Sequence, residues 1–570
     1  MFPFNYLSSL PPGLTRRSFL ARSSFAVASI PLAPRLSAAL TPAGGLEQIT
    51  LPVRSSAPPS AFVRPVMDAD ALRKLATMTI DAATHAGADW ADVRIGDRRV
   101  YRGNIFLRVG FGVRVRVGNA EAFVGGGDPT PERLVAAARA AVSTARGFAR
   151  SPAWSADASL ALAPTPRVAG EWRAPIEIDP FSVPIDEHRY VEKSLSGRFD
   201  VRLSQVGFTG GRKSFEWYGE TRAFASSEGS LVIQFLGGVY ANGHTTAGGS
   251  WWRLQRDENI ELSIPDYESC TGGFEIVVRP NRFDRLETLV RELAQYAKLR
   301  SGLLDVGRYN VVLDGSAHAS LLNSTVVPAL SLRRVLGHDV DIDGTSPLSP
   351  AEDVLGQPLF APSMMLNVDA DVPHLGAAAW DDEGVARRAV PLITHGRIVS
   401  YLSSRATLPA IAALATQRGL STQLPGIANT PDVTHSPTEI PASVSMPPAS
   451  AMASNAGTLA GLAKQLGTGL LARGGWVIVN TQGVGGYIAP HMMFEVRGGE
   501  LVRRVFGARL LFSTKKLFPT LTAVGDASTV DNSTQGMPVA FPSMMVSSVV
   551  TAPAALYRNL DVVDTRVQIS

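Results

Sequence analysis

The feature that most constrains the fold of this chain is a pattern of short apolar runs with charged residues at every second position. Residues 113–117 alternate valine with arginine, a Gly-Asn pair follows at 118–119, and a second apolar run covers residues 122–124. A period of two is typical of a half-buried strand, and the Gly-Asn pair favours a hairpin turn. The chain is only 18% charged but holds 52 glycines and 39 prolines. This balance favours a β-rich, turn-rich protein over a helical bundle.

Three amphipathic segments predict helices beside these strands. Residues 70–86 place apolar side chains on one face, and a second helix begins at Thr130-Pro131, where proline suits the first turn. A third helix is expected from Asp284 onward. Short β runs interrupted by glycine occupy much of residues 200–280. The N-terminal half is therefore expected to combine a sheet with helices.

The C-terminal half is expected to consist mainly of strands. Residues 308–313 form an apolar strand, and further strands are expected from residue 476 to residue 511. Residues 431–457 are rich in Ser, Pro and Ala and predict a surface loop. A short helix is expected to follow it over residues 459–471.

The fold class predicted from these patterns is α+β, with a sheet-plus-helices domain followed by a β-rich domain. The roughly 530 residues that follow the N-terminal signal described next exceed one hydrophobic core, so more than one domain is expected. The expected boundaries are a signal peptide at 1–43, a linker at 44–66, an N-terminal α+β domain at 67–300 and a C-terminal domain at 301–570.

The N-terminus has the pattern of an export signal. A twin-arginine box at Thr15–Leu20 precedes a short apolar run at 25–32, and small residues at 37–39 offer a cleavage site. The apolar run is far shorter than the ~20 residues of a membrane-spanning helix. The pattern predicts export through the twin-arginine pathway to the periplasm, with no membrane span. A disordered basic N-terminus is the alternative interpretation.

Charge and cysteine content exclude several functions. Residues 1–40 carry four arginines and no acidic residue, so the remaining chain has 50 basic and 50 acidic residues. Without a basic cluster beyond the signal, no nucleic-acid partner is expected. Cys270 is the single cysteine, so the chain can form neither an internal disulfide nor a zinc or iron–sulfur site built on several thiolates.

Several segments together resemble the TldD/PmbA family of metalloprotease-type proteins. They are residues 112–115, the strand 311–314, the acidic segment 380–385, residues 396–404 and residues 524–553. The resemblance covers nearly the whole chain after the signal. It implies a TldD/PmbA-like fold, dimers built around an internal chamber, and a peptide substrate that adds to a sheet edge.

Active members of this family bind zinc through His-Glu-x-x-x-His on one helix, which this chain lacks. The distance from Asp314 and the Gly-His pair at 337–338 give two alternative alignments. The matching positions are Asn323, Ser324 and Pro328 in the first, and Arg333, Arg334 and His338 in the second. Neither triplet supplies two histidines and a glutamate. A later cysteine ligand of the family has no counterpart either, because residues 524–542 contain no cysteine.

Two local clusters leave alternatives open. His338 with Asp339, Asp341 and Asp343 could bind a hard cation, but the same residues favour a polar turn. The resemblance assigns the acidic segment Asp381, Asp382, Glu383 and Gly384 to the wall of the substrate cleft. Its residues alone also fit paired catalytic acids or a tight acidic turn.

The function expected is therefore that of an exported, metallopeptidase-like subunit without its own zinc site. It would act on peptides as a homodimer or as a heterodimer with a zinc-competent family member. We expect no metal cofactor. One alternative is an active peptidase with a rearranged zinc site, in which His338 is the weak ligand candidate. The other is a non-enzymatic periplasmic binding or assembly factor.

Overall fold

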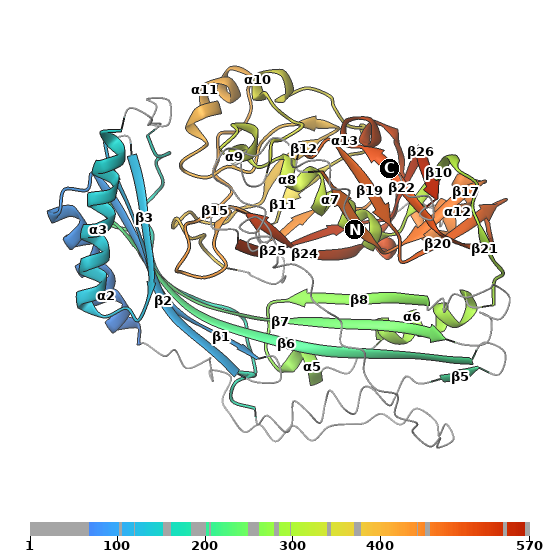
Figure 1. Cartoon of the computed structure of the whole chain (residues 1–570), viewed down its shortest axis with the longest axis horizontal. Coiled ribbons are helices and arrows are strands. Elements are labelled where there is room, and N and C mark those ends of the chain that lie inside the picture. The colour runs from blue at the N-terminus through green and yellow to red at the C-terminus, as the bar shows by residue number, and fades with distance from the viewer. Residues whose placement is uncertain are drawn as a thin grey trace, which may run out of the picture. The chain divides into compact units, whose positions relative to one another are not determined.

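A computed structural model shows the architecture (Figure 1). It describes residues 68–101, 105–118, 120–151, 161–183, 201–203, 207–248, 262–278, 284–296, 298–338, 344–369, 378–441, 443–450, 457–480, 482–539 and 544–564. The predicted signal peptide and linker lie outside the described residues. None of the helices that the structure describes is both long and apolar enough to cross a bilayer.

The N-terminal half is an eight-stranded sheet in the order β3-β2-β1-β6-β7-β4, with β5 paired to β6 and β8 to β7. The strands are β1 (Trp90–Tyr101), β2 (Ile105–Val117), β3 (Ala120–Gly127), β4 (Ala169–Arg173), β5 (Val201–Leu203), β6 (Gly207–Ser226), β7 (Leu231–Gly248) and β8 (Leu262–Cys270). All neighbours are antiparallel except β4 and β7. The predicted hairpin at 113–124 is the β2–β3 pair.

Helices α2 (Ala69–His85) and α3 (Pro131–Ala149) lie together against β1, β2 and β3 (Figure 1). Asp68 caps α2, and Thr130 caps α3 ahead of Pro131. The alanine-rich face of α3 is buried, which lets the helix approach the sheet closely. Both helices were predicted from the sequence and are confirmed.

Two further helices follow the sheet, α5 (Glu275–Val278) and α6 (Asp284–Tyr296). Helix α6 packs against β6, β7 and β8. Its Leu289 and Leu293 belong to a buried apolar cluster that also contains Leu462 and Phe494 from the C-terminal half. The helix therefore contributes to the cores of both halves of the chain.

The C-terminal half contains a ten-stranded sheet in the order β18-β19-β22-β26-β10-β17-β20-β21-β9, with β23 paired to β26. Its strands are β9 (Ser301–Leu303), β10 (Gly307–Leu313), β17 (Gly469–Arg473), β18 (Trp476–Val479), β19 (Gly485–Ala489), β20 (Met492–Arg497), β21 (Glu500–Phe506), β22 (Ala508–Ser513), β23 (Leu521–Val524) and β26 (Ala555–Asp564). Strand β10 confirms the expected strand at 308–313.

A six-stranded sheet and a two-stranded sheet complete this half. The larger one runs β13-β12-β11-β16-β25-β24. Its strands are β11 (Leu366–Val368), β12 (Val390–Thr394), β13 (Arg397–Ile398), β16 (Ser443–Ser445), β24 (Asp531–Val539) and β25 (Met544–Ala552), and the smaller sheet pairs β14 (Ala428–Asn429) with β15 (Thr438–Glu439). The predicted α+β class with a β-rich C-terminal half is confirmed.

Seven helices described in this half connect the strands. They are α7 (Gly315–Ser324), α8 (Val326–Ala329), α9 (Leu332–Val335), α10 (Ala351–Val354), α11 (Pro409–Gln417), α12 (Leu459–Leu466) and α13 (Thr514–Leu517). Helix α7 packs on β24 and β25 of one sheet and on β10, β17 and β18 of the other. It therefore lies between the two sheets, in the interior of the C-terminal half.

Two local predictions are wrong. Residues 431–457 are not simply a surface loop, because β16 lies inside the six-stranded sheet between β11 and β25, with Val444 fully buried. The helix expected over 459–471 ends at Leu466, where Gly467 adopts a positive φ of 68°. The residues after it pair with β10 as strand β17.

Candidate functional site

Helix α7 begins at a firmly held N-terminus. The carboxylate of Asp314 caps it by accepting from the backbone N–H groups of Ala317 and Gly474, each at 2.9 Å. The Nε of Arg473 donates to the same carboxylate at 3.2 Å. Because Arg473 is the last residue of β17 and Gly474 follows it, these contacts fix the start of α7 against the end of that strand.

The first alignment of the zinc motif falls at the end of α7 and in α8. Asn323 is fully buried, and its Nδ2 donates to the carbonyl oxygens of Ser533 at 3.2 Å and Ser548 at 3.1 Å. These carbonyls belong to β24 and β25. The amide of Asn323 thus bridges two strands, and its Oδ1 has no hydrogen-bond partner among the described residues.

These residues do not fit a zinc ion. Zinc needs several nitrogen, sulfur or carboxylate ligands around one point. Ser324 offers only a hydroxyl, and the buried side chain of Pro328 carries no ligand atom at all. The lone Oδ1 of Asn323 cannot form such a set. No group of three or more His, Cys, Asp or Glu able to hold a metal occurs within the described part of the chain.

The second alignment lies on α9 and just after it. The backbone N–H of Arg333 donates to Glu439 Oε2 at 2.8 Å, and Nη2 of Arg334 donates to the carbonyl of Thr345 at 3.4 Å. His338 is exposed, and its backbone N–H donates to the carbonyl of Arg333 at 2.9 Å. Asp339, Asp341 and Asp343 lie outside the described residues. A cation site at His338 therefore stays a prediction.

The acidic segment at 381–384 forms a buried tight turn. Asp381 Oδ1 accepts from the backbone N–H groups of Glu383 and Val385, both at 2.9 Å, and its Oδ2 accepts from that of Ala428 at 3.0 Å. Burial, together with the charge of Glu383, raises the pKa of Asp381 to about 8. Gly384 has a φ of 71°, and an added Cβ would lie 2.4 Å from the ring of Phe224, so only glycine fits this turn.

The other two acids of the segment pair with arginines of the N-terminal sheet. Asp382 accepts from Arg222 of β6 and from the N–H and Oγ1 of Thr430, at 2.7 and 2.8 Å. Glu383 accepts from Nη1 of Arg114, on β2, at 2.8 Å. Burial alone would raise the pKa of each acid, but the neighbouring arginines hold the pKa of both Asp382 and Glu383 below its usual value.

Each of these arginines also binds an acid of its own sheet. Arg114 donates to Asp92 at 2.6 Å, and Arg222 donates to Glu220 at 2.5 Å. We call Asp382, Glu383, Arg114 and Arg222 the charged joint. All four side chains are at least 90% buried. The joint therefore connects the N-terminal sheet to the C-terminal half by ion pairs that are shielded from solvent.

Sequence reasoning brought only half of this joint to attention. The acidic segment was singled out, whereas Arg114 was noted only as one of the charged residues that alternate with valine. Asp382 and Glu383 are buried and paired with arginines, which is compatible with a structural role for the acidic segment. Its role as a substrate contact stays a prediction. The sequence signal for the arginine partners of the acidic segment was the repeated arginine in 113–117. This repeat does not reveal which part of the chain covers the arginine side of the strand.

Comparison with known proteins agrees with this architecture. Residues 306–553 match the family model described as the PmbA/TldA metallopeptidase C-terminal domain. No curated protein matches significantly.

Solved structures match over most of the chain. A protein of Thermotoga maritima described as a candidate modulator of a DNA gyrase shares 15% identity at a TM-score of 0.60, over 86% of this chain and 99% of that one. A similarly described protein of Bacteroides thetaiotaomicron shares 16% identity at 0.58, over 86% and 98%. TldE of Thermococcus kodakarensis shares 16% identity at 0.57, over 86% and 99%.

The fold is that of a protein of the TldD/PmbA metallopeptidase type. Residues 306–553 match the C-terminal domain of the TldD/PmbA family, and the overall fold matches that of these solved structures. The resemblance predicted from the sequence is confirmed.

Proposed function

We propose that this chain is a zinc-free subunit of a peptide-processing assembly, paired with a family member that retains the zinc helix. The observation that carries the proposal is Asn323. At the first zinc-ligand position of the first alignment, its amide is fully buried and donates to two strand carbonyls. The Nδ2 group at this helix end is thereby held by carbonyls of the protein itself.

The neighbouring contacts support the same role. Ser320, one turn earlier on α7, donates through its Oγ to the hydroxyl of Ser533 at 3.0 Å. The same strand thus receives two neutral hydrogen bonds from α7. The resemblance to this family implies dimers built around a chamber. An intact fold without zinc ligands is suited to completing such a chamber, with a partner supplying the chemistry.

The test is to purify the mature chain alone and after co-expression with a zinc-competent family member from the same genome. We expect the chain alone to hold well below about one zinc after dialysis and to cleave no unfolded peptide. The co-expressed pair should elute as one complex with chelator-sensitive peptidase activity. Chelator-sensitive hydrolysis by the chain alone would contradict the proposal. A stable complex without activity would favour a binding or assembly role.

We also propose export to the periplasm through the twin-arginine pathway, on the basis of the Thr15–Leu20 box. Replacing both arginines, Arg16→Lys with Arg17→Lys, should leave the full-length precursor in the cytoplasm. Cell fractionation with immunoblotting measures this directly. The Arg22→Lys variant, which changes an arginine outside the box, is the matched control and should be exported normally. Export of the double variant at the wild-type level would overturn the assignment.

A further inference from the structure

Strand β18 (Trp476–Val479) is an edge of the ten-stranded sheet, and no strand lies beyond it in the described part of the chain. Its neighbour is β19, with Ile478 opposite Tyr487. An edge strand presents a row of backbone N–H and C=O groups that can pair with another chain. The open side of β18 is therefore a surface on which a further strand fits.

The hydrogen-bond pattern shows which backbone groups face this open side. The N–H of Asn480 donates to the carbonyl of Gly485 at 3.0 Å, which continues the pairing of β18 with β19 by one residue. Successive residues of an antiparallel strand bond alternately to one side and to the other, so Ile478 also faces β19. The backbone groups of Val477 and Val479 therefore point to the open side.

The side chains give β18 one covered face and one exposed face. Val477 packs against the main apolar core of the C-terminal half. Side chains alternate along a strand, so Trp476 and Ile478 lie on the opposite face, where they are 64% and 53% exposed. The edge thus combines an open backbone with two large apolar side chains, which is the composition of a strand that associates with another.

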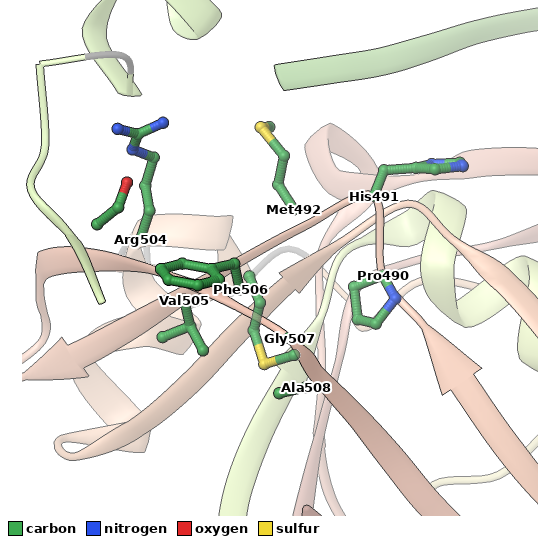
Figure 2. A pocket seen from close by; sticks show the side chains of 10 residues that line it. Pro490, His491, Met492, Arg504, Val505, Phe506, Gly507 and Ala508 are labelled. Carbon is green, nitrogen blue, oxygen red and sulfur yellow. The ribbon is translucent and has the colours of Figure 1, made fainter. Parts of the chain in front are cut away.

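Trp476 is held in place by a neighbouring ring. Figure 2 shows the side chain of His491 pointing away from Met492 and Arg504. Its ring stands edge-on to that of Trp476, with the ring centroids 6.2 Å apart. An aromatic side chain that is already positioned loses little conformational entropy when a partner covers it. Trp476 is therefore preorganised for packing against another protein.

The charge of this region favours an identical edge as the partner. Residues 474–494 contain no Asp, Glu, Lys or Arg. Many edge strands carry charged side chains, especially lysine, that keep two copies apart, and β18 has none. Its Trp, Val and Ile residues also favour strand pairing. Two copies can thus meet edge to edge without repulsion between like charges, whereas a strongly charged partner would find no opposite charge.

We propose that two copies of this chain pair through β18, antiparallel and about a two-fold axis at Ile478. In this register Val477 of one copy lies opposite Val479 of the other, so the backbone groups that face the open side bond to each other. The two Ile478 side chains lie directly opposite each other, and each Trp476 reaches the Ile478 of the other copy. Every contact is made twice, as in a closed two-fold dimer.

The first test is sedimentation velocity of the mature chain from about 1 μM to about 100 μM. We expect a dimer whose fraction rises with concentration. Ile478→Lys places two positive charges opposite each other and should weaken dimerisation at least about tenfold, or by about 1.4 kcal/mol. Val502→Lys, on β21 at a side chain that is 41% exposed, is the matched control and should dimerise like the wild type.

A disulfide cross-link tests the register. The Cα atoms of a non-hydrogen-bonded antiparallel pair lie about 4.5 Å apart, which is within reach of a disulfide. Under oxidising conditions Ile478→Cys should therefore form covalent dimers on a non-reducing gel. The wild type, whose single cysteine is Cys270, measures the background, and Val502→Cys measures random collision.

The proposal is wrong if the chain is still a monomer at about 100 μM, if Ile478→Lys leaves the dimer unchanged, or if cross-linking is equal at positions 478 and 502. The pairing requires neither a metal nor a zinc-competent family member, so it stands or falls separately from the proposed assembly role. A monomer whose complex with that family member is lost in Ile478→Lys would assign the edge to the heterodimer instead. A monomer that binds an extended peptide, with the binding lost in the same variant, would assign the edge to substrate.

Discussion

The molecule contains two buried polar regions, one around α7 in the C-terminal half and one, the charged joint, between the two halves. Around α7, neutral hydrogen bonds join the helix to the strands and loop beside it. His318 bonds to Pro553, and both Ser320 and Asn323 bond to Ser533. In the charged joint, arginines and carboxylates are paired away from water. Loss of a neutral partner leaves one unpaired dipole, whereas loss of an ionic partner leaves an uncompensated charge. The two regions should therefore differ in how strongly they respond to mutation and to pH.

The largest effect is expected from Arg114→Met. This change keeps much of the side-chain volume but leaves Asp92 and Glu383 without their shared cation. Breaking a buried ion pair costs about 3–5 kcal/mol. Urea unfolding followed by circular dichroism measures the loss. The double variant Arg114→Met with Glu383→Gln should recover part of it, and a double variant no more stable than the single one would show that the Glu383 pair is not the cause.

The pH dependence of unfolding should separate the two regions. His318 on α7 is fully buried. Its Nδ1–H donates to the carbonyl of Pro553, and in the neutral ring its Nε2 accepts from the hydroxyl of Tyr557. Burial lowers its pKa to about 4. The unfolded chain binds a proton near its ordinary pKa of about 6.5, so stability is lost as the pH falls from about 6.5 to about 4. A shift of this size corresponds to roughly 3 kcal/mol. In His318→Phe this part of the profile should disappear.

The charged joint should respond at lower pH. The folded-state pKa values of Asp382 and Glu383 are lowered, so their contribution is present above about pH 4, the ordinary value, and is lost as the pH falls through the folded values. Asp382→Asn should therefore flatten the unfolding profile only below about pH 4. A change in this variant confined to pH 5–7 would contradict the assignment of the acid limb to the joint.

The difference between the regions also explains what sequence reasoning could reach. Helices at 70–86 and after Thr130 were predictable because their caps and apolar faces are local. The charged joint was not, because Arg114 and Glu383 are 269 residues apart. The alternation in 113–117 indicates a strand. It does not reveal that the C-terminal half covers the face of this strand that carries Arg114. Strand β16 was missed because it has just three residues and gains its burial from β11 and β25.

A smaller loss is expected from Asn323→Leu in the neutral region. The substitution keeps a similar volume and removes the two hydrogen bonds to Ser533 and Ser548. Leaving buried carbonyls unpaired costs about 1–3 kcal/mol. The loss should be independent of pH from 4 to 8, because neither the amide nor the carbonyls titrate. A loss as large as that of Arg114→Met, or one that varies with pH, would show that Asn323 couples to charged groups.

The smallest effect is expected at an ion pair that has the chemistry of the joint without its burial. Arg308 Nε lies 2.9 Å from Asp561, but the two side chains are 74% and 57% exposed. Water and salt screen such a pair, so Arg308→Met should change the free energy of unfolding by only about 0–1 kcal/mol. Urea unfolding at low and high salt, run beside Arg114→Met, compares the same substitution at two depths. Equal losses in the two variants would mean that burial does not set the strength of the charged joint.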